Sequence, residues 1–175
     1  KIVQSLPEDQ KIVFTPDRNL GAYINSTLQR EMVLWDGACH VHDQLTADEV
    51  FKFKAKYPNA KVLAHPECKA TILALADFVG STAAMLQFTE TDLTMEYIVA
   101  TETGILYEMQ KRNPEKIFHV VNSSETCNCN DCEYMKLNSL SKIYSALQNE
   151  APELLLDQEL MEKAKLPILK MLELS

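Results

Sequence analysis

The stretch KVLAHPECKATILALADFVGSTAAMLQF, residues 61–88, decides the fold of this chain. It opens with an apolar run at Lys61–Ala64 that predicts a strand, and a helical pattern follows at Ala70–Ala76. A weaker strand at Phe78–Val79 and a helix at Ser81–Phe88 repeat the same order. Strands that alternate with helices over short connections form parallel sheets covered by helices. The stretch therefore predicts an α/β fold.

The alternation continues on both sides of this stretch. The pattern predicts further strands at Lys11–Thr15, Glu31–Trp35, Tyr97–Ala100 and Ile117–Val121, and further helices at Asn19–Thr27, Thr46–Tyr57 and Gly104–Arg112. A capping-box pattern begins the helix at Thr46. Two more helices, separated near Pro152, are predicted between residues 138 and 175, and the first residues from Lys1 suggest a helix already under way.

A short internal repeat indicates how these elements are organised. Cys39 stands seven residues before Thr46, and Cys132 stands seven residues before Ser139, where another helix is expected to begin. A third copy, without its cysteine, aligns residues 1–9 with residues 142–153. The repeat predicts a cysteine followed by a helix and a small α/β unit, used several times, with the lost cysteine about ten residues upstream of Lys1.

Composition limits the classes of partner. The chain has 175 residues, of which 46% are hydrophobic and 24% charged, as in ordinary soluble globular proteins. Its formal charge of −8 argues against binding nucleic acid or an anionic membrane surface, but it leaves room for a small basic pocket and an anionic substrate. We see neither a membrane span nor a signal peptide and expect a cytoplasmic protein. A start without methionine predicts a processed or fragmentary chain.

The chain has five cysteines, Cys39, Cys68, Cys127, Cys129 and Cys132. An odd count without a secretory signal favours reduced thiols, and clustered cytosolic thiols are typical of metal or catalytic sites. The run Cys127-x-Cys129-x-x-Cys132 is compatible with half a zinc knuckle, a redox pair or cluster ligands. Together with Cys39, His40 and His42, these cysteines would supply enough ligands for a zinc site. The simpler alternative is that the three cysteines lie in a loop and bind no metal.

Other reactive residues also follow predicted strands, where parallel sheets bind their ligands. His65-Pro66-Glu67 supplies an imidazole and a carboxylate for acid–base catalysis or for holding a polar substrate, unless Glu67 merely begins the next helix. Ser81 and Thr82 offer hydroxyls and backbone N–H groups that suit a carboxylate or phosphate, although a plain N-cap has the same sequence. No nucleotide-binding motif is present.

Two further polar residues have simpler explanations. Arg18 follows the first predicted strand, and although it could contact an anion, we expect it to be solvated. His119 lies in an apolar strand and is expected to be structural.

Six stretches together resemble the quinolinate synthase family of de novo NAD synthesis. They are FTPDRNLG (14–21), WDGACHVH (35–42), AHPEC (64–68), GSTAAM (80–85), TETGIL (101–106) and CEYMK (132–136). They occur in the family's order across almost the whole chain, and their combination is highly specific.

The resemblance implies a reaction and a fold. Family members condense iminoaspartate with dihydroxyacetone phosphate, with loss of phosphate and water, to form quinolinic acid. They consist of three similar small three-layer α/β units with short parallel sheets in a pseudo-threefold arrangement. Each unit gives one cysteine to a single [4Fe–4S] cluster, whose open iron acts as a Lewis acid on the substrate.

The resemblance also implies roles for particular residues. Cys39 and Cys132 match two of the three cluster ligands, with the third ligand upstream of this chain. The segment of His65, Pro66 and Glu67 matches the family's substrate-contacting motif, in which His65 and Glu67 are the catalytic candidates.

The same comparison of motifs implies roles for three other residues. Ser81 and Thr82 match the family's carboxylate or phosphate site, and His42 matches a histidine close to the cluster. Cys68 is expected to be a bystander.

The resemblance further implies a division of the chain. Residues 1–38 would belong to the middle α/β domain, residues 39–131 to a second α/β domain, and residues 132–175 to C-terminal helices that pack back on the remainder. The family's first domain is absent, so the isolated chain is expected to be inactive. Expected partners are that N-terminal part, as a domain or fragment, and the enzyme that supplies iminoaspartate.

Two other hypotheses stay open. One is a non-catalytic module that binds zinc or a cluster. The other is a redox protein that uses Cys129 and Cys132 as a dithiol.

Overall fold

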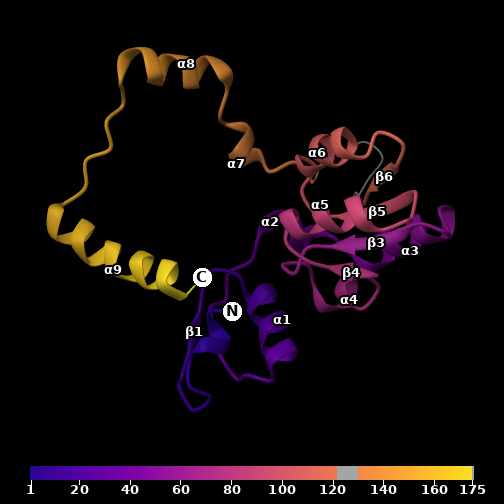
Figure 1. Ribbon diagram of the computed structural model, residues 1–175, viewed down its shortest axis with the longest axis horizontal. Helices are drawn as coiled ribbons and strands as arrows, with labels where there is room; N and C mark the ends of the chain where they lie inside the picture. Colours follow the sequence, from indigo (N-terminus) through magenta and orange to yellow (C-terminus); the bar gives the residue numbers. More distant parts are fainter. Residues whose placement is uncertain (122–129, 175) are drawn as a thin grey trace. The chain divides into compact units, whose positions relative to one another are not determined.

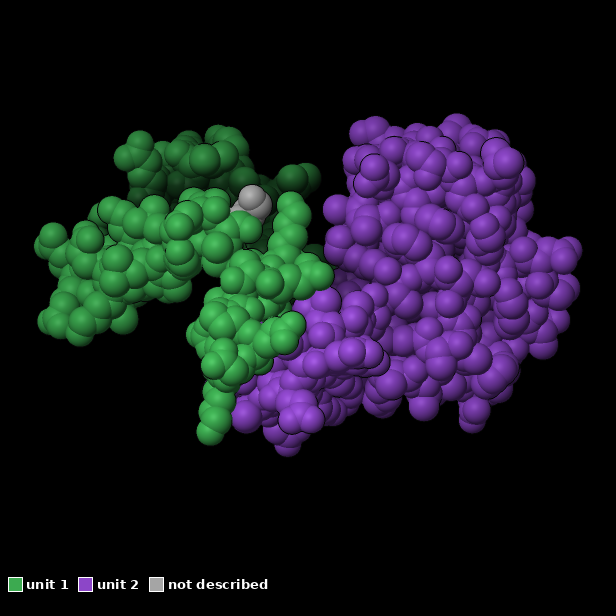
Figure 2. All heavy atoms as spheres, turned by 60° about the horizontal axis from the view of Figure 1, so that its bottom comes forward, with its two compact units in different colours: residues 1–11, 134–175 green, residues 12–133 purple. Residues whose placement is uncertain are grey.

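The computed structural model describes residues 1–121 and 130–174 of the chain. It divides into two compact units, which Figure 2 shows in different colours. One unit is Ile12–Glu133, and the other combines Lys1–Lys11 with Tyr134–Ser175. The first unit contains both sheets and most of the residues that the sequence analysis singled out.

Two parallel sheets organise the larger unit (Figure 1). The first pairs β1 (Val13–Phe14) with β2 (Val33–Leu34). The second has four strands in the order β4-β3-β5-β6, formed by Phe78–Val79, Lys61–Ala64, Glu96–Ala100 and Ile117–Val120. All of its pairings are parallel, so the carboxyl ends of its strands lie at one edge.

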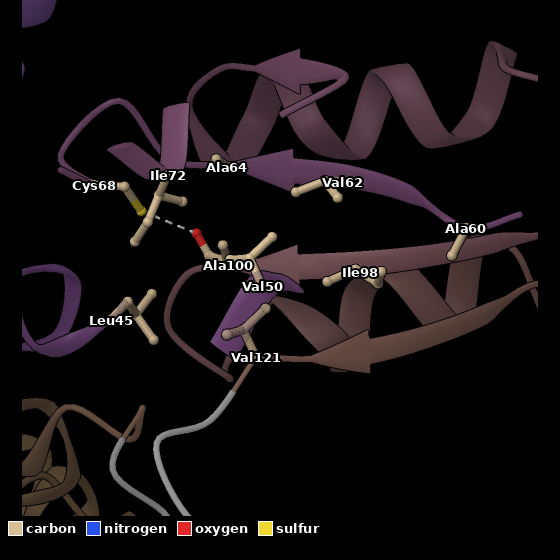
Figure 3. Packing of buried hydrophobic residues seen from close by; sticks show 10 residues of the cluster. All are labelled: Leu45, Val50, Ala60, Val62, Ala64, Cys68, Ile72, Ile98, Ala100 and Val121. Carbon is tan, nitrogen blue, oxygen red and sulfur yellow. Dashed lines mark hydrogen bonds between the residues drawn. The ribbon is translucent and has the colours of Figure 1, made fainter. Parts of the chain in front are cut away.

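The central strands are buried on both faces, which makes this part of the chain a three-layer unit. On one face, Val62 of β3 and Ile98 of β5 pack with Val50 of α3 and Ile72 of α4 (Figure 3). On the other face a second core cluster forms, from Leu63, Met85, Tyr97, Val99, Ile105 and Met109 of β3, β5, α5 and α6. Successive strand residues thus alternate between the two helical layers, as the pleat requires.

The helices of the larger unit lie between these strands. They are α1 (Arg18–Leu28), α2 (His40–Gln44), α3 (Ala47–Lys56), α4 (Ala70–Leu73), α5 (Thr82–Thr91) and α6 (Ile105–Arg112). Side-chain caps fix where three of them begin, because an oxygen of Asp17, Thr46 or Ser81 accepts a hydrogen bond from a backbone N–H of the first turn. At Thr46 the predicted capping box is complete.

The chain ends are helical as well. A 3-10 turn occupies Val3–Ser5, and three helices follow the larger unit, namely α7 (Glu133–Lys136), α8 (Leu140–Asn149) and α9 (Gln158–Leu174). Ser139 caps α8 through a hydrogen bond from the Lys142 N–H. None of the helices in the described residues is both long and apolar enough to cross a bilayer.

The predicted α/β fold with short parallel sheets is confirmed. All six predicted strands are present, although β1 and β2 are shorter than predicted. The short helices α2 and α7 were not predicted, and the expected helix at the start is only a 3-10 turn. The division at residues 39 and 132 and the pseudo-threefold arrangement concern the intact protein and stay predictions.

The predicted repeat has a counterpart in local structure. Cys39 directly precedes the short helix α2, and Thr46 then caps α3. In the same way Cys132 directly precedes the short helix α7, and Ser139 then caps α8. Both cysteines therefore stand at the start of the same sequence of elements.

Candidate active site

The carboxyl ends of three neighbouring strands meet at one edge of the four-stranded sheet. Ala64, the last residue of β3, pairs with Val79 of β4 and with Ala100 of β5. The next residues are held there by backbone bonds, because His65 N–H donates to the Ala100 carbonyl at 3.2 Å and Gly80 N–H donates to the Ala64 carbonyl at 3.2 Å. The loops that follow β3, β4 and β5 thus begin side by side at this edge of the sheet.

His42, on α2, lies at the centre of the candidate site. Its ring stacks on His65, with 4.6 Å between ring centroids and 16° between planes. Its Nε2 forms a hydrogen bond of 2.9 Å with the Thr101 hydroxyl. Burial above all, helped by the neighbouring His65, lowers the pKa of His42 to about 4, so the ring is neutral near pH 7.

The second nitrogen of His42 faces a carboxylate. Nδ1 lies 3.1 Å from Glu67 Oε2, yet the angles are not those of a hydrogen bond. Among the described residues Nδ1 therefore has no hydrogen-bond partner, although it is buried. Buried polar atoms are rarely left unpaired, so this nitrogen marks a place for a ligand.

His65 and Glu67 are oriented by the bend at Pro66. The Glu67 N–H donates to His65 Nδ1 at 3.3 Å, which places the proton of the neutral His65 ring on Nε2. Burial is the main cause that lowers the pKa of His65. Burial also raises the pKa of Glu67, with a smaller contribution from Asp17, while a hydrogen bond with Cys39 opposes the shift.

Glu67 is not part of a helix start. Helix α4 begins at Ala70, and the Glu67 carboxylate is directed to His42 and lies 3.7 Å from His65 Nδ1. The alternative in which Glu67 serves the dipole of the next helix therefore has no support from the geometry.

Three ligand atoms from separate parts of the sequence converge in this site. The thiol of Cys39, one ring nitrogen of His42 and one carboxylate oxygen of Glu67 all lie within 4.8 Å of one another. A thiolate, an imidazole and a carboxylate are donors that zinc and iron accept. The arrangement can therefore hold a metal or a polar substrate beside one.

Ser81 and Thr82 occupy the same sheet edge, outside this group of three. The Ser81 hydroxyl accepts a hydrogen bond from the Ala84 N–H at 3.2 Å, so it caps α5 as its sequence predicts. Both residues are exposed. The remaining N–H groups at the start of α5 face an edge where an anion could bind.

Two comparisons relate this sequence to known proteins. The family described as "Quinolinate synthetase A protein" matches residues 1–173. A quinolinate synthase of Chloroherpeton thalassium is 47% identical over 175 residues, which cover 99% of this chain and 54% of that protein. Those of Thermosynechococcus vestitus and Microcystis aeruginosa are 47% and 44% identical, each over all of this chain and 55% of the relative.

The chain belongs to the quinolinate synthase family. It spans about half the length of the curated relatives that it matches. The predicted resemblance is thereby confirmed.

The three cysteines that the structure describes in this member of the quinolinate synthase family fall into two environments. Cys39 and Cys132 are free, partly exposed thiols, each at the start of a short helix. Cys68 is fully buried, its thiol donates to the Ala100 carbonyl at 3.3 Å, and burial raises its pKa to about 12 (Figure 3). The first two thiols suit a metal cluster, whereas Cys68 fits the expected bystander in the core.

Cys127 and Cys129 lie outside the described residues. The choice of Cys132 as a ligand therefore rests on its motif and on its position before α7.

Arg18 and His119, the other polar residues considered from the sequence, both contact acidic side chains. Arg18 is not simply solvated, because its guanidinium forms ion pairs with Asp36 at 3.3 Å and Asp43 at 3.1 Å. His119 bonds Glu96 at 2.9 Å and stacks on Tyr57, which fits the expected structural role.

Three residues of the site had no role assigned from sequence. Thr101 bonds His42, while Asp17 and Glu102 accept hydrogen bonds from the backbone of Cys39 and Cys132. Their only signal in the sequence is that each follows a predicted strand within a motif of the family.

Proposed function

We propose that this chain is part of an enzyme that condenses iminoaspartate with dihydroxyacetone phosphate to quinolinic acid, with loss of phosphate and water. The observation that carries the proposal is the convergence of Cys39, His42 and Glu67 within 4.8 Å, in a chain of this family. The intact protein would have three α/β domains in a pseudo-threefold arrangement and work in the cytoplasm, supplied with iminoaspartate by a partner enzyme.

Cys39 and Cys132 would hold a [4Fe–4S] cluster, together with a third cysteine that this chain lacks. The support is that both thiols are free and stand at matching positions of a local repeat. When bound, such a cluster supplies an iron with an open position that acts as a Lewis acid on the substrate.

His65 and Glu67 would bind the substrate and move its protons. Because His65 Nδ1 accepts the Glu67 N–H, the Nε2–H of the neutral ring is a donor for a substrate oxygen. Glu67 lies beside both imidazoles in a partly buried position, where a carboxyl group can both accept and release a proton. Stacking on His42 keeps the His65 ring in place.

Ser81 and Thr82 would receive a carboxylate or phosphate group of a substrate. They begin a helix of ten residues at the same sheet edge as His65, and the N-terminus of such a helix favours an anion. This site accounts for an anionic substrate on a protein with a net charge of −8.

Anaerobic reconstitution of the longer protein, with the upstream part restored, tests the proposal. We expect a brown protein with four irons for each protein chain, which forms quinolinic acid from iminoaspartate and dihydroxyacetone phosphate. A protein that takes up iron and sulfide but does not form quinolinic acid would refute the proposed activity.

A second function has one observation in its favour. The group of Cys39, His42 and Glu67 offers three of the four ligands of a typical zinc site, which suits a non-catalytic zinc module. A colourless protein that contains zinc after purification without oxygen would support this alternative and exclude the cluster.

A further inference from the structure

Asp17 connects a helix start to the backbone of a cysteine. Its side chain is buried, with only 3% of the residue exposed. One oxygen, Oδ1, accepts the Leu20 N–H at 2.8 Å and caps α1. The other oxygen, Oδ2, accepts the Cys39 N–H at 2.7 Å across 22 residues of sequence. Hydrogen bonds to an ionised acceptor are among the stronger ones in proteins.

Glu102 makes a similar pair of bonds, one just before a helix and one to the other cysteine, although it does not cap that helix as Asp17 does. Its Oε2 accepts the Gly104 N–H at 2.6 Å, where α6 begins, and its Oε1 accepts the Cys132 N–H at 3.3 Å. A Cβ on Gly104 would meet Oε2 at 2.6 Å, so a larger residue there would require the Glu102 carboxylate to shift. Thr103 adds a second link, since its N–H donates to the Asn130 carbonyl and its hydroxyl bonds Asp131.

The two arrangements are equivalent in the topology. Asp17 follows β1, and Cys39 follows the parallel neighbour β2. Glu102 follows β5, and Cys132 comes after the parallel neighbour β6. In both cases the carboxylate joins the loop of the first strand to the cysteine-bearing loop of the second. Such agreement is not required by helix capping, for which a single oxygen suffices.

The Cys39 loop is fastened at further points beside the carboxylate. The Arg18 N–H donates to the Gly37 carbonyl at 2.7 Å, and the Arg18 guanidinium pairs with Asp36 and Asp43 on either side of the cysteine. A Cβ on Gly37 would lie 2.4 Å from the Pro16 carbonyl oxygen. The two loops therefore pack backbone against backbone around Cys39.

We propose that Asp17 and Glu102 are positioning residues, which fix the backbones of Cys39 and Cys132 so that both thiolates face the cluster. This inference rests on the proposed function, because it takes these cysteines as cluster ligands. Holding the N–H group of a residue restricts its φ and thus the direction of its Cα–Cβ bond. Residues that orient metal ligands commonly change metal affinity by about 10- to 100-fold when they are replaced.

The test uses amide variants of the longer, reconstituted protein. Asp17→Asn and Glu102→Gln keep the shape of each side chain and one oxygen, for the Leu20 N–H or the Gly104 N–H, but they turn an NH2 group toward the cysteine N–H. The matched control is Asp77→Asn, which weakens the hydrogen bond of 2.8 Å that the Val62 N–H donates to a carboxylate at the opposite end of β3.

The readouts are the rate at which a chelator removes iron, at equal distance below each melting temperature, and the EPR signal of the reduced cluster. We expect both test variants to lose iron about 10-fold faster than the control or more, with an altered EPR signal. Because Asp17 is buried and its variant can fail to fold, Glu102→Gln, on a partly exposed side chain, tests the proposal on its own.

The outcomes distinguish the positioning role of Asp17 and Glu102 from the proposed function. If the parent holds the cluster and Glu102→Gln loses iron no faster than Asp77→Asn, with the parent's EPR signal, the positioning role is wrong. If the parent itself takes up no iron, the proposed function is wrong, and the bonds to both cysteines are part of the fold alone.

Discussion

At the scale of single residues, the candidate site combines two neutral imidazoles with one carboxylate. His42 and His65 are stacked and partly or fully buried, and burial lowers the pKa of both. Glu67, beside them, has a raised pKa for the same reason. Removal of these groups from water therefore disfavours the charged form of each side chain.

Replacing Glu67 tests whether its carboxyl group takes part in the reaction. Glu67→Gln keeps the shape but cannot exchange a proton, so we expect a rate lower by roughly 10²-fold or more with fold and cluster retained. His65→Ala should behave alike, because the two side chains are aimed from one strand end. The measurement is anaerobic turnover of the longer protein at matched iron content and melting temperature. Near-normal rates in both variants would leave this segment without a catalytic role.

Replacing the cysteines one at a time tests which of them hold the proposed cluster. Cys39→Ala and Cys132→Ala should each abolish the cluster, since a thiolate ligand cannot be lost without its iron. Cys68→Ala should keep it, at a cost of about 1 kcal/mol for the lost packing and hydrogen bond to Ala100. Iron and sulfide content after anaerobic reconstitution shows which variants retain the cluster. Iron retained in Cys132→Ala but lost in Cys129→Ala would show that the wrong cysteine had been chosen.

The sequence could predict the catalytic candidates but not the residues that hold the cysteines. Cys39, His65 and Glu67 could be predicted because they lie in short motifs that are recognisable in the sequence alone. The bonds from Asp17 to Cys39 and from Glu102 to Cys132 join residues 22 and 30 positions apart. Such pairs depend on how neighbouring parallel strands place their loops, which no local pattern contains.

At the scale of elements, the strength of the apolar pattern decides what is predictable. β3 and β5 were predicted within one residue because both faces of these strands are buried. β1 and β2 pair over two residues only, and half of each is exposed, so their ends could not be predicted. Helix α2 has five residues with mainly polar side chains and depends on tertiary contacts such as that of His42 with Thr101.

Asp92 joins three elements and gives the fold a predicted dependence on pH. Its carboxylate pairs with Lys61 of β3 at 2.5 Å and accepts the Tyr97 hydroxyl of β5 at 2.9 Å. Lys61 above all holds the pKa of Asp92 well below its usual range. Because an unfolded aspartate has a pKa of about 3.9, this stabilisation is complete above that pH and is lost as the pH falls further.

We therefore expect Asp92→Asn to melt at a lower temperature than the parent at pH 7. The difference should shrink as the pH falls from about 5 to about 2.5, because the parent then loses the same interaction. Asp9→Asn, at an exposed position, is the control for a lost surface charge. A difference in melting temperature that stays constant over this range would contradict the assigned cause.

At the scale of the whole molecule, the C-terminal helices are the part least explained by the chain alone. Neither α8 nor α9 has a buried residue. Large apolar side chains are exposed on and between them, among them Leu140 at 87%, Leu147 at 77% and Leu154 at 89%. Apolar surface of this extent usually faces another part of a protein. This exposure supports the proposal that residues 132–175 pack against the remainder of the intact enzyme.

The 175 residues alone should therefore form no quinolinic acid, whereas the longer protein should. The chain carries Cys39 and Cys132 but not the third ligand that the proposed cluster needs, and the relatives are nearly twice as long. Both forms are to be reconstituted with iron and sulfide without oxygen and assayed with iminoaspartate and dihydroxyacetone phosphate. Binding of a fluorescent apolar dye should be strong for the short form and weak for the long one, because the faces of α8 and α9 would be covered. Turnover by the isolated chain would overturn the proposed division of the active site between this chain and the missing part.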